Sequence, residues 1–192
     1  MKRTITIIAS FLIGSSSFSQ NDVQASASDN WIGWMNVSYN NGPGGSPSSY
    51  WFGSQWGVGD LATLLDVPGN TISLYPNWNT YDPADTAWWD SGNNQGNKYL
   101  EASTYAEPMG FNGQDLTFSG YVVSNNLDAS YDAKFFIKAL DPNDNYNDAL
   151  GGTKVMDLPA SGSFTVSATG AELQSGLIVQ YGFAIMGRNG TR

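Results

Sequence analysis

The strongest constraint on the fold is a two-residue alternation of apolar and polar side chains in the second half of the chain. Apolar residues occupy alternate positions in 116–122, 131–139 and 179–185, with a shorter run at 164–166. Successive side chains of a strand point to opposite faces, so this pattern predicts half-buried β-strands. Seven of these side chains are expected to face one core: Phe118, Phe135, Ile137, Phe164, Val179, Tyr181 and Phe183.

Four more runs are strand-like, at 32–39, 50–56, 71–75 and 98–106. Clusters rich in glycine, proline and asparagine separate them, and such clusters favour tight turns. Only 59–67, with three leucines at helical spacing, predicts a helical turn or two. The pattern therefore predicts an all-β fold, an antiparallel β-sandwich of eight or nine short strands, with a jelly-roll arrangement favoured.

The first residues follow the three-part plan of a secretory signal peptide. Lys2 and Arg3 are basic, 5–14 is apolar, and 15–20 is mostly small and polar. The apolar run is too short to anchor the chain in a bilayer. An N-terminal strand or buried helix would also be apolar, but the basic start favours a signal peptide.

This reading divides the chain into three parts. We expect a signal peptide over 1–19, cleaved after Ser19, a disordered linker over 20–29 and a single domain over 30–192. The mature protein is then secreted, to the extracellular space or the cell surface, and no later segment would hold it in a membrane.

Composition excludes several functions. The chain has 192 residues, no cysteine and no histidine, which removes the usual zinc ligands and Ser-His or Cys-His pairs. Its formal charge is −9, and loss of Lys2 and Arg3 leaves 6 cations against 17 acids, about −11. This acidity does not favour nucleic acid or a strongly sulfated polysaccharide. The only candidates for a local basic patch are Lys134, Lys138 and Lys154.

Catalytic carboxylates are scarce. The only glutamates are Glu101, Glu107 and Glu172, whereas a retaining glycosidase needs two carboxyl groups about 5 Å apart. Glu101 and Glu107 share strand parity, but Pro108 is expected to end their strand, so solvated surface residues are the simpler interpretation. We expect a non-catalytic protein, with a glycoside hydrolase or lyase kept as an alternative.

A calcium site is a further hypothesis. Asp141, Asn143 and Asn145 place oxygen ligands at alternate positions, as calcium loops do. The segment lacks the glycine and the closing glutamate of an EF-hand, and asparagine and aspartate also cluster in ordinary hairpin loops. Calcium bound there would order the loop rather than perform chemistry.

The segment 76–97 has no strand or helix period, yet it carries three of the seven tryptophans. Long loops without periodicity are usually functional or disordered, and disordered segments are poor in aromatics. Flat rings beside planar amides and carboxylates suit a sugar ligand. The residues expected to bind a polysaccharide are Trp78, Tyr81, Trp88, Trp89, Asp90, Asn93, Asn94 and Gln95.

Packing of the same rings against the sandwich is the competing interpretation. Trp88 and Trp89 are adjacent, so in an extended backbone one would anchor the loop while the other faces solvent. Trp34, by contrast, lies in a strand-like run and shares a face with Ile32, as a core aromatic would.

The order of several segments resembles the carbohydrate-binding modules attached to bacterial polysaccharide-degrading enzymes. The segments that carry this resemblance are Tyr50-Trp51-Phe52-Gly53, Gly96-Asn97-Lys98 through Tyr105, Phe118-Ser119-Gly120, Phe136-Ile137-Lys138 and Gln180-Tyr181-Gly182-Phe183. The resemblance covers most of 30–186 and implies a non-catalytic β-sandwich without naming a ligand. Such modules usually accompany a catalytic domain, and the chain ends soon after a predicted strand, which leaves open a shortened reading frame.

An extracellular structural or adhesive subunit is the alternative function. Exposed aromatic residues and an unpaired sandwich edge would let such a subunit assemble, or self-associate, through β-strand pairing.

Overall fold

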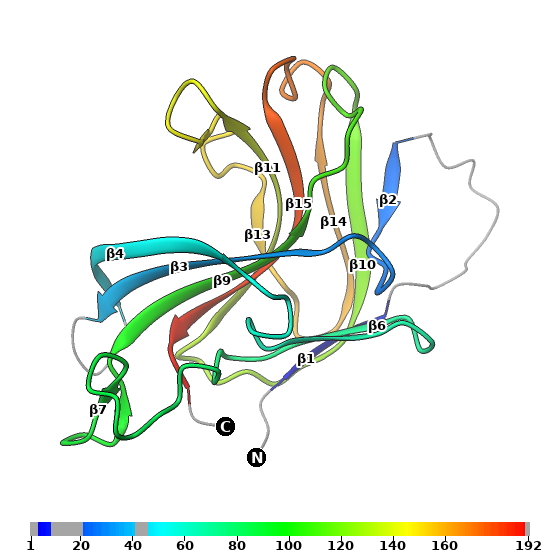
Figure 1. The fold of residues 1–192 in the computed structure, drawn as a ribbon. Helices are drawn as coiled ribbons and strands as arrows, with labels where there is room; N and C mark the ends of the chain where they lie inside the picture. Colours follow the sequence, from blue (N-terminus) through cyan, green and yellow to red (C-terminus); the bar gives the residue numbers. More distant parts are fainter. Residues whose placement is uncertain (1–3, 9–20, 41–45, 191–192) are drawn as a thin grey trace.

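The computed structural model describes residues 4–8, 21–40 and 46–190, and in these ranges the chain is all-β. Fifteen strands form two curled sheets and one short ladder (Figure 1). The strands are β1 (Ile5–Ile8), β2 (Asp22–Gln24), β3 (Ile32–Asn40), β4 (Pro47–Trp56), β5 (Thr63–Asp66), β6 (Thr71–Leu74), β7 (Trp89–Asp90), β8 (Gln95–Gly96), β9 (Lys98–Ala106), β10 (Leu116–Asn125), β11 (Asp132–Asp141), β12 (Asn147–Asp148), β13 (Val155–Asp157), β14 (Gly162–Ala168) and β15 (Ile178–Arg188).

The two sheets divide the long strands between them. The six-stranded sheet has the order β14-β10-β1-β6-β5, with β2 also on β10, and the seven-stranded sheet has the order β12-β11-β15-β9-β3-β4, with β13 also on β11. β7 and β8 pair with each other. The all-β, sandwich-like prediction is confirmed. The count of eight or nine strands is wrong, because strands of two to four residues are too short for alternation to reveal. The jelly-roll arrangement stays a prediction.

The core between the sheets follows the alternation in the sequence. All seven side chains predicted to face inward are buried, from 0% exposed for Phe118 to 6% for Tyr181. They meet aliphatic residues of the six-stranded sheet, including Ile72 and Leu74. A second cluster around Met35, Val37 and Leu100 fills the space under β3, β4 and β9.

The helical turn predicted over 59–67 is wrong. Turns cover residues 58–62, and 63–66 forms β5 against β6. Leu61 is buried in the cluster under β3, whereas Leu64 and Leu65 are 50% and 37% exposed. The three leucines therefore do not share one buried face, and strand pairing overrides their helical spacing.

The seven-stranded sheet bends sharply, and β9 and β15 curve in mid-course (Figure 1). In the pairing register, Lys138 lies beside Gln180 and Glu101 beside Met186. Six residues of β15 separate these positions, about 20 Å in a flat strand. Yet the Lys138 Nζ lies 3.4 Å from the Glu101 Oε1. The face that carries both side chains is therefore concave.

Gly182 of β15 allows a close approach between β15 and β9. A Cβ at this position would lie 2.6 Å from the Cα of Tyr105 and would also overlap the carbonyl oxygen of Thr104. Because glycine has no side chain, β15 approaches the backbone of β9 this closely.

The N-terminal residues take part in the fold. β1 lies between β6 and β10, and the side chains of Ile5 and Ile7 are fully buried. In place of the linker expected over 20–29, residues 22–24 form β2, which runs parallel to β10, and Ala25 and Ala27 are buried. The rest of the predicted signal peptide, 1–3 and 9–19, and the first linker residue, Gln20, lie outside the described residues.

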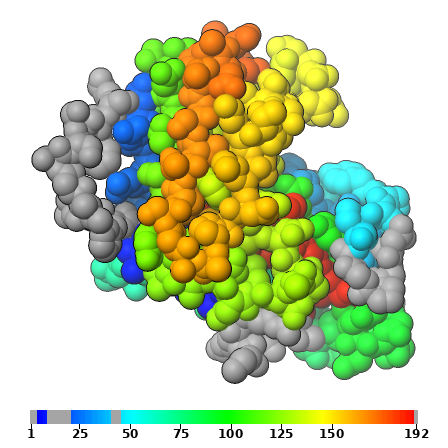
Figure 2. Space-filling model, turned by 180° about the vertical axis from the view of Figure 1, so that it is seen from behind, coloured from blue at the N-terminus to red at the C-terminus, as the bar shows by residue number. Residues whose placement is uncertain are grey.

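β14 and β4 lie in different parts of the molecule. From behind, Figure 2 shows β14 in orange beside the yellow segment that follows β11, while β4 in cyan and the green segment around β7 lie together at one side. No helix in the described ranges is long and apolar enough to cross a bilayer.

Candidate functional site

The segment 78–97 forms a compact loop held to the end of β15. Trp89 is only 3% exposed, and its ring meets the Tyr81 ring edge-on at 4.9 Å. The buried Asn189 side chain donates to the Trp88 carbonyl oxygen at 2.9 Å and to the Thr80 Oγ1 at 3.2 Å, and accepts from the Lys98 backbone N–H at 3.0 Å. Asn189 therefore connects the start of the loop, at Thr80, with the residue that follows its end, Lys98. No motif in the sequence indicated this role.

The loop tryptophans pack mainly on the protein. The half-buried Trp88 ring contacts Trp51, Phe52 and Trp56 of β4, with ring centroids 5.4 to 6.5 Å apart. Trp78, also half-buried, lies edge-on to Tyr75 at 4.9 Å. Tyr81 is 41% exposed and is the most accessible of the four loop aromatics.

The polar residues of the loop form a turn. Asp90 accepts hydrogen bonds from the Gly92 and Asn93 backbone N–H groups and from the Asn93 side-chain amide. The Asn93 amide is the main reason why the pKa of Asp90 lies below its ordinary value. Asn94 has a φ of +51°, as tight turns require, and its side chain is exposed together with that of Asn93, while Gln95 is half-buried. The loop thus exposes the side chains of Tyr81, Asn93 and Asn94.

A second aromatic group lies on the concave face of the seven-stranded sheet. Trp34 of β3 is 37% exposed and Tyr50 of β4 is 63% exposed. Both converge over Gly53: a Cβ there would lie 2.5 Å from the Tyr50 hydroxyl oxygen and 3.2 Å from the Trp34 Cζ2. The absence of a side chain at Gly53 makes room for the two rings.

Polar contacts orient this group. The Trp34 Nε1 donates to the Asn36 Oδ1 at 2.9 Å, and the Asn36 Nδ2 donates to the Glu101 Oε2 at 3.4 Å. The other Glu101 oxygen pairs with Lys138, whose Nζ also lies 4.7 Å from the Phe136 ring centre. The concave site, defined as Trp34, Asn36, Tyr50, Gly53 and Glu101, therefore has aromatic surface beside an oriented amide and carboxylate.

Sequence reasoning assigned Trp34 to the core because it shares a face with Ile32. The two residues do share a face, but it is the concave one, where Ile32 packs against the small cluster of Tyr105, Phe136 and Ala184. The usable signal was Gly53, because a glycine inside a strand often marks a close approach of other groups.

A third aromatic group lies at the junction of β3, β4 and β9. The Lys98 Nζ lies 4.9 Å from the Tyr39 ring centre and 5.1 Å from that of Trp51, within the range of cation–π attraction. Burial lowers the pKa of Lys98, an effect that the charge of Asp85 opposes. Because Lys98 is 5% exposed, it supports the rings of Tyr39 and Trp51 rather than presenting a charge to solvent.

The predicted calcium ligands lie in a tight turn. The Asp141 Oδ1 accepts from the Asn143 backbone N–H at 2.8 Å, and Asn145 and Tyr146 have positive φ angles, as hairpin loops require. Across the described ranges, no group of three or more histidine, cysteine, aspartate or glutamate side chains is placed to hold a metal ion. The calcium site stays a prediction.

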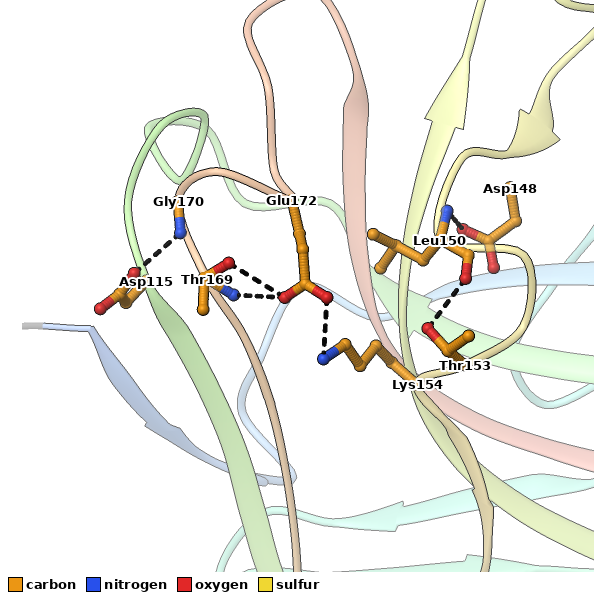
Figure 3. A network of polar contacts seen from close by, with 8 residues as sticks. All are labelled: Asp115, Asp148, Leu150, Thr153, Lys154, Thr169, Gly170 and Glu172. Carbon is orange, nitrogen blue, oxygen red and sulfur yellow. Dashed lines mark hydrogen bonds and ion pairs between the residues drawn. The ribbon is translucent and has the colours of Figure 1, made fainter.

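The three lysines considered as a basic patch are each paired with an acid. Lys134 pairs with Asp157, Lys138 with Glu101 and Lys154 with Glu172. Figure 3 shows Lys154 meeting Glu172, which also accepts from Thr169, and shows Asp148 accepting from the Leu150 N–H on the neighbouring turn. These contacts leave the three lysines no common cationic surface.

The glutamates considered for catalysis lie at different sites. Glu101 belongs to the concave site, while Glu107 accepts from the Gln180 Nε2 at 2.7 Å. Glu107 lines a pocket of about 510 Å³ that also contains Asp29, Trp31 and Tyr181. Burial raises the pKa of Asp29, which accepts from the Tyr181 hydroxyl at 3.5 Å.

Comparisons with known proteins add no assignment. A scan against protein-family models and searches of curated proteins and of solved structures found no match to this chain.

Proposed function

We propose that this protein is a secreted, non-catalytic carbohydrate-binding domain that binds a neutral polysaccharide across the concave site. The observation that carries the proposal is the convergence of two exposed rings, Trp34 and Tyr50, over Gly53 beside the hydrogen-bonded Asn36 and Glu101. Sugar rings have apolar faces and a rim of hydroxyl groups, so they need this combination of flat apolar surface and planar hydrogen-bonding groups.

The energetic argument rests on preorganisation. Aromatic side chains present a large area with few rotatable bonds, so holding them in place costs little on binding. Trp34 is already fixed by its bond to Asn36, and Asn36 by its bond to Glu101. A ligand therefore meets side chains that need little further ordering.

The charges favour a neutral ligand. In the described ranges, three of the five basic side chains are ion-paired and Lys98 is buried. The fifth, Arg188, donates to the Gly96 carbonyl oxygen at 2.9 Å. A polysaccharide with many carboxylate or sulfate groups would meet the surface of an acidic protein whose five described basic side chains form no cationic patch to offset the repulsion.

The loop 78–97 supplies the rim in this proposal. Arg188 follows the concave face along β15, opposite Tyr99, and its bond to Gly96 ties the loop to the end of that face. Tyr81 and the amides of Asn93 and Asn94 would extend the contacts to a longer chain.

Single alanine variants test the proposal. Trp34→Ala and Tyr50→Ala are compared with the parent for retention on a panel of neutral polysaccharides, with melting temperature measured in parallel. Each should weaken affinity about thirtyfold, which corresponds to about 2 kcal/mol for an aromatic anchor. Met109→Ala is the control, because Met109 is 92% exposed in the loop between β9 and β10 and should change neither property.

Two results would contradict the proposal. One is a parent protein that is retained by no neutral polysaccharide of the panel. The other is retention by Trp34→Ala and Tyr50→Ala equal to that of Met109→Ala.

A further inference from the structure

An ion pair links the concave site to a strand on the far side of β15. Lys138 belongs to β11 and Glu101 to β9, and β15 lies between these two strands. The Lys138 Nζ lies 3.4 Å from the Glu101 Oε1, although the two residues pair with positions of β15 that are six residues apart, Gln180 and Met186. This contact therefore joins parts of the face that strand pairing alone does not bring together.

Polar contacts run in series from this ion pair to an exposed ring. The second oxygen of Glu101 accepts from the Asn36 Nδ2 at 3.4 Å. The Asn36 Oδ1 in turn accepts from the Trp34 Nε1 at 2.9 Å. Because the amide of Asn36 must accept on one side and donate on the other, only one of its two orientations satisfies both neighbours. The orientation of the Trp34 ring therefore depends on the position of Glu101.

Lys138 is itself held in place. Its Nζ lies 4.7 Å from the ring centre of Phe136, which is 1% exposed, so the cation packs over a fixed aromatic ring. The side chains of Lys138 and Glu101 are 23% and 30% exposed. A partly buried pair is screened by salt less than a fully exposed one, so Lys138 provides Glu101 with a defined partner on this face.

We propose that Lys138 is a positioning residue of the concave site and fixes the Trp34 ring in its binding orientation. It acts through Glu101 and Asn36 rather than by contacting the ligand. The inference rests on the proposed carbohydrate-binding function and adds to that site a residue from two strands away. A ring that is already oriented loses less conformational freedom when a sugar stacks on it, so affinity should depend on Lys138.

The indole N–H resonance of Trp34 tests this role without any ligand. In proton–nitrogen correlation spectra it is the signal that disappears in Trp34→Phe. Lys138→Met removes the charge and keeps a long side chain against Phe136. The Trp34 resonance should therefore shift, with a lower heteronuclear Overhauser effect, because the ring becomes more mobile. The other tryptophan resonances should keep their positions, which separates repositioning of one ring from a general loss of folding.

Lys134→Met is the matched control. Lys134 also lies on β11, and the substitution removes the same charge, but Lys134 pairs with Asp157 rather than with Glu101. The Trp34 resonance should keep its parent position in this variant. A resonance that is unchanged in Lys138→Met, or that moves as far in Lys134→Met, would overturn the positioning role.

Affinity for a neutral polysaccharide that the parent retains is the second measurement. Lys138→Met should weaken it about fivefold, the upper end of what a partly exposed ion pair contributes. Lys138→Arg keeps the charge and should stay within about twofold of the parent, as should Lys134→Met. In the Trp34→Ala background, Lys138→Met should have no further effect, because the ring that it positions is absent.

The double variant separates positioning from other roles. Equal weakening by Lys138→Met with and without Trp34 would mean that Lys138 acts on the ligand by another route, and would overturn the proposal. A parent protein that no neutral polysaccharide retains would contradict the proposed function, while the Trp34 resonance would still decide whether Lys138 fixes the ring.

Discussion

Replacing Trp89 should show that this ring anchors the loop 78–97 rather than binding ligand. The side chain is 3% exposed and packs edge-on against Tyr81. A tryptophan buries roughly 150–250 Å², so at about 25 cal/mol per Å² the upper limit of its contribution is about 4–6 kcal/mol. Because Tyr81 is itself 41% exposed, the loop can partly collapse into the space. We therefore expect Trp89→Ala to lower the free energy of unfolding by about 3 kcal/mol, the low end for such substitutions.

The assay is urea unfolding followed by tryptophan fluorescence and by circular dichroism, with Trp34→Ala as the matched control. Trp34 is 37% exposed, so its removal should cost less than about 1 kcal/mol. A loss below about 1 kcal/mol for Trp89→Ala, or a larger loss for Trp34→Ala, would refute the assignment of these two rings. Glycan retention by folded Trp89→Ala should fall less than that of Trp34→Ala.

Three further predictions concern a buried carboxyl group, a tightly packed glycine and the predicted calcium site. Burial raises the pKa of Asp29 above its ordinary value of 3.8, so Asp29 ionises at lower pH in the unfolded chain than in the folded one, and its ionisation lowers the free energy of unfolding as pH rises above 3.8. Asp29→Asn should therefore lose less unfolding free energy than the parent between pH 4 and pH 7. An identical pH profile for the two proteins would contradict this. Gly182→Ala should lower stability by about 2 kcal/mol, because its Cβ would overlap the β9 backbone, whereas Gly59→Ala, with open space around it, should be neutral in the same unfolding assay. Millimolar calcium should raise the melting temperature through the predicted site, with a chelator reversing the effect and Asp141→Asn abolishing it; a temperature unchanged by calcium would remove the site.

The alternation of apolar and polar residues predicted the central strands because one face of each strand is buried in the core. Phe135, Ile137 and Phe183 lie between two sheets, and a polar residue would be costly on this buried face but not on the opposite one, so the period of two remains visible. β5 escaped detection because two of its four residues, Leu64 and Leu65, are apolar but exposed, and β7 and β8 are too short to show any period.

The concave site was harder to predict, because its residues come together through strand pairing that the sequence does not specify: Asn36 of β3 lies beside Gly53 of β4 and Glu101 of β9. Trp34 and Glu101 lie far apart in the sequence, and Lys138 reaches Glu101 from a strand two places away. The side-chain period tells which residues share a face, and it placed Trp34 with Ile32 correctly. It does not tell whether that face is covered, since an aromatic residue is as compatible with a buried face as with a binding face.

The segment 5–8 shows the same limit at the level of function. Ile-Thr-Ile-Ile satisfies a short strand pattern and, after two basic residues, the apolar part of a signal peptide. Both roles need only aliphatic side chains over a short length, so composition cannot separate them. The surroundings distinguish the two roles: in the structure, β6 and β10 pair with residues 5–8 from both sides, and Ile5 and Ile7 pack in the main core. In the structure residues 5–8 take this position as β1, which agrees with the strand pattern, and cleavage after Ser19 stays a prediction.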